Sequence, residues 1–179
     1  MSFLYLASIG RIEEELLLFL EARLGEVFGL QVGRLHPFVE PSYAFDPIRG
    51  QYSSVALMRQ LIEICPDGAR LLGITEKDLF IPVLSFVFGQ AQLNGRLAVV
   101  SLARLHQEFY RLAPDPAILE QRALKESMHE LGHTFGLVHC PERSCPMSLA
   151  TNIRQLDLKK TQWCVSCEIM LREAMGQSR

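Results

Sequence analysis

The sequence predicts an α/β fold, a small twisted mixed sheet with helices packed against it, on the strength of two observations. Short apolar runs typical of buried strands alternate with stretches of helical periodicity from residue 3 to residue 135. The remaining C-terminal part has little regular pattern and holds four closely paired cysteines. Because 179 residues suit one core, we expect a single domain over 1–179, with an N-terminal part (1–136) and a C-terminal part (137–179).

Glycines and acidic residues mark where the elements of the first half begin and end. An apolar run that starts at residue 3 stops at Gly10, which suits a buried strand. Apolar side chains then recur at helical spacing until Gly29, and acidic residues fill the first turn, where the helix dipole favours them. Cys65 ends the next helix, and we interpret it as a buried residue without a chemical role. The elements expected here are strand 3–9, helix 11–28, strand 30–35, a proline-rich loop 36–50, helix 51–64, strand 70–74 and a short strand 79–83.

The second half contains a hairpin signal and a helix-start signal. Asn94-Gly95 lies between two apolar runs, and this dipeptide favours the tight turn between antiparallel strands. Asp115-Pro116 supplies an N-cap followed by an N1 proline, so a helix is expected to run from there to about Phe135. Such a helix is about 30 Å long, enough to cross the domain. The elements expected here are strands 84–89 and 96–101, helices 102–112 and 115–135, an irregular stretch 148–163 and a last helix from Val165.

Composition and charge exclude several classes of partner. The chain is 49% hydrophobic and 21% charged, which is ordinary for a globular protein. A net charge of −2 and a pI near 6.2 offer no positive surface, so we expect no nucleic acid and no anionic membrane as partner. No apolar run reaches the roughly 18 residues of a membrane span, and the N-terminus lacks the basic start of a signal peptide. We therefore expect a cytoplasmic monomer with reduced thiols.

The most specific feature is an HExxHxxGxxH motif. Its fixed positions are His129, Glu130, His133, Gly136 and His139. If each residue occurs at about one position in twenty, five fixed positions match by chance about once in three million windows. Four residues apart on a helix, His129 and His133 present their imidazoles to one point, and Glu130 flanks that point. Gly136 can end the helix in a left-handed conformation, which lets His139 return to the same ion.

Three histidine ligands indicate a catalytic zinc, since they leave the fourth tetrahedral position open for water. The competing interpretation is a set of surface histidines beside a charged neighbour, which the rarity of the pattern argues against. Glu126 lies three residues before His129 on the same helix face. It can orient an imidazole from outside the ligand set, although a solvent-facing position is the more common one for a glutamate.

Four cysteines follow the motif directly. Cys140 and Cys145 are separated by four residues, Cys164 and Cys167 by two, and eighteen residues lie between the pairs. Two close pairs of this kind are typical of a tetrahedral structural zinc site. The alternative is a pair of disulfides, which a reducing compartment disfavours. We therefore expect a second zinc that holds the C-terminal part together in place of a large core.

The motif and its surroundings resemble a known family. An extended histidine motif followed by a methionine, here Met147, resembles the metzincin metalloproteases. The cysteines fused to it resemble the archaemetzincin family in particular, whose pattern is HExxHxxGxxH, C-x4-C-x-M, a spacer of about seventeen residues and C-x2-C. The spacer here has sixteen residues, which we interpret as loop variation.

The resemblance implies a metzincin-like fold with a zinc-binding active-site helix and a zinc-stapled C-terminal subdomain. His129, His133 and His139 would bind the catalytic zinc, and Glu130 would be the general base. Met147 would form a turn beneath the metal. The second zinc would be held by Cys140, Cys145, Cys164 and Cys167.

The leading functional prediction is a zinc-dependent metallopeptidase that acts on peptides or proteins. In metzincins the edge strand of the sheet borders the cleft and pairs with extended substrate, so Ser85–Gly89 is the candidate, with a core strand as the alternative reading. Two other functions are a non-hydrolytic zinc-binding or interaction protein and a hydrolase of a non-peptide amide. Glu130 argues against the first, because metal binding alone does not require it. The sequence has no tyrosine or histidine after His139 to assist an oxyanion.

Overall fold

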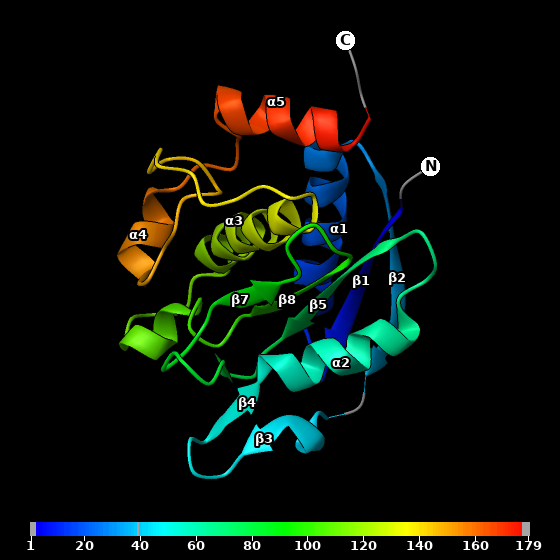
Figure 1. The fold of residues 1–179 in the computed structure, drawn as a ribbon. Helices are drawn as coiled ribbons and strands as arrows, with labels where there is room; N and C mark the ends of the chain where they lie inside the picture. Colours follow the sequence, from blue (N-terminus) through cyan, green and yellow to red (C-terminus); the bar gives the residue numbers. More distant parts are fainter. Residues whose placement is uncertain (1–2, 39, 177–179) are drawn as a thin grey trace.

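The computed structural model describes residues 3–38 and 40–176 and shows the expected mixed sheet. Its main sheet consists of β1 (Phe3–Ile9), β2 (Gln31–Phe38), β5 (Arg70–Thr75), β7 (Gly89–Ala91) and β8 (Leu97–Ser101). The strand order is β2-β1-β5-β8-β7 (Figure 1). Four strands run parallel, and β7 pairs antiparallel with β8 at one edge. The α/β prediction is confirmed.

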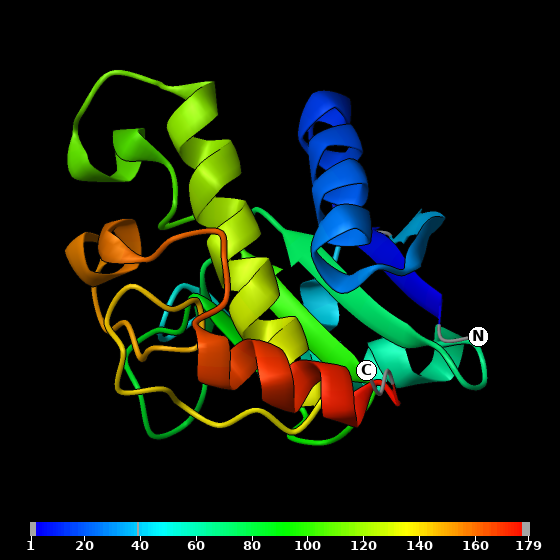
Figure 2. The ribbon, with the colours of Figure 1, turned by 90° about the horizontal axis from the view of Figure 1, so that it is seen from above.

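Helices cover both faces of this sheet (Figures 1 and 2). Helices α1 (Glu14–Phe28) and α3 (Pro116–Thr134) lie side by side on one face, and α2 (Ser54–Ile64) packs on the other. Helix α1 begins with two glutamates and ends at Gly29, whose φ of 61° is left-handed, as predicted.

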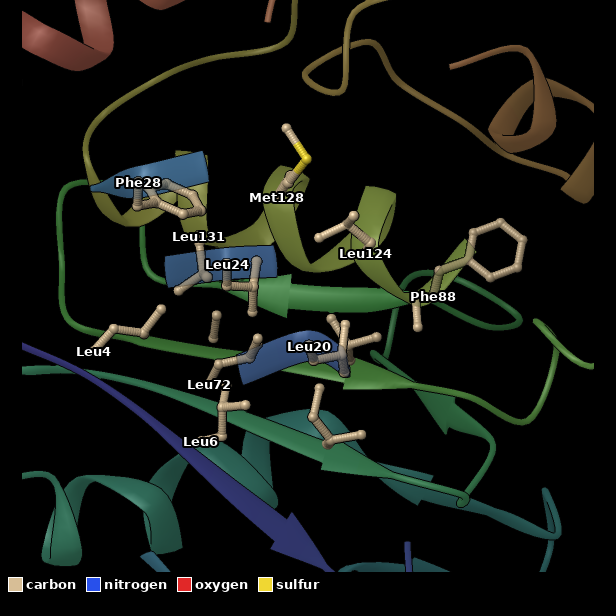
Figure 3. Close-up of a cluster of buried hydrophobic side chains, with 14 of the residues drawn as sticks. Leu4, Leu6, Leu20, Leu24, Phe28, Leu72, Phe88, Leu124, Met128 and Leu131 are labelled. Atoms are coloured by element: carbon tan, nitrogen blue, oxygen red, sulfur yellow. The ribbon is translucent and has the colours of Figure 1, made fainter. Parts of the chain in front are cut away.

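The larger core lies between the sheet and the helices α1 and α3. Leucines four residues apart on α1 face alternate residues of β1 and β5, because strand side chains point to opposite faces in turn. Figure 3 shows these side chains filling the space below α3. Members of this cluster are Leu4, Leu6, Leu20, Leu24, Leu72 and Leu124. The core therefore fixes the height of α3 above the sheet.

A second, three-stranded sheet contains β3 (Phe45–Asp46), β4 (Gln51–Ser53) and β6 (Leu79–Phe80). The prediction of a helix over 51–64 is wrong at its start. The buried Gln51 side chain donates to Asp78 Oδ2 and to the Ser85 carbonyl at 2.9 and 3.0 Å, which holds residues 51–53 extended. The Ser53 hydroxyl then accepts from Ala56 N, so the helix begins only at Ser54.

The predicted hairpin forms around Asn94, which has a positive φ of 52°, but its first strand is shifted. Residues 84–88 are not part of the strand, which is confined to Gly89–Ala91. This segment is held by an isolated antiparallel bridge between Val87 and Leu79 and by the Arg49 guanidinium, which donates to the carbonyls of Pro82 and Leu84. The edge strand is therefore β7, and only Gly89 of the Ser85–Gly89 candidate belongs to it.

Two further predictions of local structure are wrong. Within 102–112 only a short 3-10 turn forms, at Gln107–Tyr110, and Arg111 ends it in the left-handed region. The nearby carbonyl of Leu105 accepts from the Arg122 side chain rather than from a helical N–H. Within 148–163, the Asn152 side chain caps a short helix α4 that sparse apolar residues did not reveal. Helix α4 spans Ile153–Leu158 and is followed by the expected last helix, α5, at Val165–Ala174.

None of the helices in the described part of the chain is both long and apolar enough to span a bilayer. Cys65 is buried after α2, as expected.

Candidate active site and cysteine site

Helix α3 carries the first two histidines of the motif into the middle of the molecule. Its start is fixed by Asp115, whose Oδ1 accepts from the Ile118 N–H at 3.1 Å, and by Pro116 in the first turn. At the other end Gly136 has a φ of 89°, and the Leu137 N–H returns to the carbonyl of Gly132. This turn reverses the chain and brings His139 back towards the helix.

The three imidazoles lie close together. The ring centroids of His129 and His133 are 4.6 Å apart, and His139 lies 5.3 and 5.1 Å from them. One ligand atom from each ring lies within 4.8 Å of the others. His129 is buried, His133 is half-buried and His139 is exposed. One side of the cluster is therefore open to solvent.

Hydrogen bonds define the tautomers of the two helical histidines. His129 Nδ1 lies 2.8 Å from the Pro146 carbonyl, and His133 Nδ1 lies 2.7 Å from the Leu137 carbonyl. A carbonyl only accepts, so each Nδ1 carries the proton and each Nε2 presents a lone pair. These two Nε2 atoms are 3.2 Å apart. Two lone pairs at this distance repel unless a cation lies between them.

The donor set fits tetrahedral zinc. Two nitrogens bound to one zinc at about 2.0–2.1 Å are expected about 3.3 Å apart, close to the observed separation. The backbone carbonyls hold the Nδ1 protons, which is how metal-binding imidazoles are commonly oriented. Burial, and then the positive charge of Lys159, lower the pKa of His129 well below its usual value, so the ring is neutral and ready to bind a metal.

Glu130 lies next to the histidine cluster in a buried position. Only 5% of Glu130 and 4% of Glu126 are exposed, and the two carboxyl groups are hydrogen-bonded partners. Burial and then the charge of Glu126 raise the pKa of Glu130 well above its usual range. The expectation that Glu126 faces solvent is wrong, and its partner is the Glu130 carboxyl rather than an imidazole.

Lys159 is a residue of this site that sequence reasoning missed. It is 3% exposed, and its Nζ lies 3.5 Å from His129 Nδ1. Burial lowers the pKa of its ammonium group, while the charges of Glu126 and Glu130 oppose that shift. Its stretch of sequence is polar, so nothing in the local pattern marks it as buried. The buried carboxyl pair thus has one buried cation as its neighbour.

A cleft of about 420 Å³ opens onto the histidines and Glu130. Gly89 and Ala91 of the edge strand β7 line one wall, so the sheet edge borders the cleft. Among the described residues that line it there is no lysine, arginine or tyrosine. The other walls are largely apolar and include Leu84, Phe86, Phe88, Leu149 and Ala150. The described lining therefore offers no lysine or arginine to an acidic ligand.

The four C-terminal cysteines form a second cluster. Their sulfur atoms lie within 4.8 Å of one another, and Cys140 Sγ is 3.7 Å from Cys164 Sγ. A disulfide has sulfurs about 2.05 Å apart, whereas tetrahedral zinc with bonds of about 2.3 Å places them about 3.8 Å apart. All four thiols are free, which is the arrangement expected for a metal and not for disulfides. Cys145 and Cys167 are buried.

Met147 lies behind the histidines of α3. A Cβ on Gly132 would come within 2.4 Å of Met147 Sδ, so the sulfur packs directly against the helix backbone. Gly132 lies between the two helical histidines in sequence. The Cys140 N–H donates to the Met147 carbonyl at 3.0 Å, which ties this turn to the start of the cysteine cluster.

A glutamate beside three converging imidazoles, in a cleft along a sheet edge, defines a metalloprotease. The model of Peptidase family M54 matches residues 33–173 of the chain. The archaemetzincin of Methanocaldococcus jannaschii is 41% identical over 160 residues, which covers 89% of this chain and 87% of that protein. The archaemetzincin of Methanopyrus kandleri is 46% identical over 132 residues, covering 74% of this chain and 72% of that protein. The chain belongs to peptidase family M54, and the predicted resemblance to archaemetzincins is confirmed.

Solved structures agree with this assignment. A zinc-dependent peptidase from Methanocorpusculum labreanum matches with a TM-score of 0.87 and 31% identity, covering 94% of this chain and 99% of that one. The archaemetzincin structure from Methanopyrus kandleri matches with a TM-score of 0.85 and 38% identity, covering 98% and 96%. The fold is thus shared over nearly the whole chain.

Proposed function

We propose that this protein hydrolyses peptide bonds with a zinc ion bound by His129, His133 and His139. The observation that carries the proposal is the pair of Nε2 lone pairs 3.2 Å apart, with Glu130 buried beside them. When bound, zinc supplies a Lewis acid that polarises a carbonyl and acidifies water. Glu130 would then accept a proton from the attacking water at a carboxylate oxygen and pass it to the departing amine nitrogen.

The environment of Glu130 suits this role. Its raised pKa brings the carboxylate closer to the pKa that a general base needs near neutral pH. Its neighbour Glu126 shares a hydrogen bond with it and so restricts its position. Both glutamates line the cleft but are almost fully buried, so little bulk water reaches the carboxyl pair.

Substrate binding is proposed to use the outer edge of β7. One edge of Gly89–Ala91 pairs with β8, and β7 is the last strand in the sheet order. An extended peptide can add to such an edge through backbone hydrogen bonds, with little demand on its side chains. The apolar walls of the cleft would then contact side chains on either side of the scissile bond.

The four cysteines are proposed to hold a second, structural zinc, giving two zinc ions per chain and a C-terminal subdomain (137–179) anchored on the metal. The 3.7 Å sulfur–sulfur distance supports a tetrahedral tetrathiolate. Elemental analysis of protein purified without chelator should give about two zinc ions per chain. A reproducible value of one zinc ion per chain would show that either the cysteine site or the histidine site does not bind zinc.

The test of the reaction is digestion of a peptide library by zinc-loaded protein, with Glu130→Gln in parallel. Glu130→Gln keeps the size of the side chain and removes the base, so zinc content should stay at the wild-type level. Turnover should fall by about 10²–10⁴-fold. Cleavage by neither protein would contradict the proposal and favour an amide other than a peptide bond or a purely binding role. Cleavage by both proteins at equal rates would show that the hydrolysis does not depend on Glu130 and does not occur at this site.

A further inference from the structure

The edge strand approaches the active-site helix most closely at Gly89. A Cβ at this position would lie 2.6 Å from Glu130 Cγ, 2.7 Å from Glu130 Oε1 and 2.8 Å from the Val99 carbonyl oxygen. Real Cβ atoms do not approach other atoms this closely, so any side chain at position 89 must displace a neighbour. The Glu130 side chain occupies the volume that a side chain at position 89 would fill.

The backbone conformation does not explain the glycine. Gly89 is absent from the glycines with positive φ, so an alanine could adopt the same backbone angles. Gly89 also lies within a regular antiparallel pair with Val100 of β8. Glycine is therefore needed at position 89 because there is no space for a side chain, and not because of the backbone angles.

Because side chains alternate between the two faces along β7, position 89 faces the active site. Gly89 and Ala91 line the cleft, and Gln90 between them points to the other face, where its Oε1 accepts from the Ser54 hydroxyl at 2.6 Å. This bond and the pairing with β8 hold the register of the strand, which places Gly89 against Glu130 of α3. The two residues that face the helix are thus the two smallest available.

We propose that Gly89 is a positioning residue, whose missing side chain lets the Glu130 carboxylate lie directly against the edge strand. A peptide added to β7 would then have its backbone next to the base without an intervening side chain. This inference rests on the proposed role of Glu130. It predicts that a single methyl group at position 89 displaces the base while leaving the three histidines in place.

The test compares Gly89→Ala with Gly33→Ala. Gly33 is a matched control, because it also lies in an edge strand, β2, and its Cβ would also meet a side chain closely, the Tyr5 ring at 2.9 Å. Gly89→Ala should lower kcat by about 10²-fold with little change in KM and unchanged zinc content, since a displacement of about 1 Å is enough for such a loss. Gly33→Ala should keep the wild-type kcat. Equal kcat values for the two variants would overturn the proposal.

A second measurement does not depend on activity. Gly89→Ala should lower the melting temperature of the metal-free protein by about 4 °C or more, and by clearly less in a Glu130→Ala background, where the crowded atoms are gone. The contact with the Val99 carbonyl is present in both backgrounds, so the difference reports Glu130 alone. If wild type cleaves no peptide, the proposed function fails, but the comparison of melting temperatures still tests the contact between position 89 and Glu130. Equal losses in the two backgrounds would show that position 89 does not set the place of Glu130.

Discussion

Truncation of Met147 measures how much the metal site depends on the packing behind it. The side chain is fully buried, and its sulfur lies against Gly132 between the two helical histidines. It also belongs to the larger core cluster, together with Met128 and Leu131 of α3. Because Met147 is surrounded by other core residues, Met147→Ala leaves a cavity at the wall of the helix that carries the imidazoles.

The expected loss follows from the size of the removed group. Three heavy atoms are lost, each worth about 0.8 kcal/mol in transfer free energy, and the remaining cavity adds to this sum. We expect about 3–4 kcal/mol of lost unfolding free energy. For a domain of this length that corresponds to a drop of about 10 °C in melting temperature.

Thermal unfolding followed by circular dichroism, with and without zinc, provides the measurement. Met170→Ala is the matched control, since that methionine is 43% exposed on α5 and its truncation should change little. Met147→Leu keeps most of the volume and should cost less than about 1.5 kcal/mol. A melting temperature for Met147→Ala within a degree of the Met170→Ala value would refute the packing argument.

Three further perturbations have clear expected outcomes. The Glu76 carboxylate, 2.8 Å from His106, raises the pKa of that imidazole, so its contribution to stability is present below pH 6.5 and is lost as pH rises through the raised value. The melting temperature of Glu76→Gln should therefore differ from wild type more at about pH 6 than at about pH 8.5. Cys167→Ser should lower the zinc content by one ion per chain and loosen the C-terminal part, as measured by elemental analysis and proteolysis. Arg122 donates twice to Asp157 at 2.8 Å, and Arg122→Ala should cost about 3 kcal/mol in urea unfolding.

Two of these perturbations have a control variant, and the third has an outcome that would contradict it. Cys65→Ala removes a cysteine outside the cluster and should leave the zinc content unchanged, so an equal loss in both variants would contradict the assignment of Cys167. Arg154→Ala removes an exposed arginine and should change the unfolding free energy by less than about 0.5 kcal/mol. A pH-independent difference for Glu76→Gln would show that the ion pair with His106 does not form in solution.

The candidate ligands could be named from the sequence because their spacing is a local property. His129 and His133 share a helix face by the 3.6-residue period alone, and Gly136 marks the turn that returns His139. The strands were predictable where apolar runs were long, as in β1 and β5. Short elements such as β7 were misplaced, because the residues before that strand make contacts with distant parts of the chain, a bridge from Val87 to Leu79 and bonds from the Arg49 side chain.

The surroundings of Glu130 could not be predicted, because they come from distant parts of the chain. Gly89 reaches it from a strand forty-one positions earlier, and Lys159 lies near it from a stretch with no apolar pattern. Helical spacing correctly placed Glu126 on the face of α3 that carries the histidines, but it gave no sign that Glu126 would be buried there. Burial is a property of the packed fold, and single residues in polar stretches carry no signal of it.

The arrangement of charges also indicates where the protein is least stable without metal. Two carboxyl groups and one ammonium group are buried together, and burial of charges is unfavourable unless they are well paired. Around them lie neutral imidazoles with lone pairs facing one another, which is also unfavourable without a cation. The carboxyl groups and two of the imidazoles belong to the C-terminal half of α3, whereas Lys159 directly follows α4. Metal binding removes the repulsion between the lone pairs of the imidazoles. The sheet and α1, which carry the apolar core, contain none of these groups, so metal loss should loosen the site before it loosens the core.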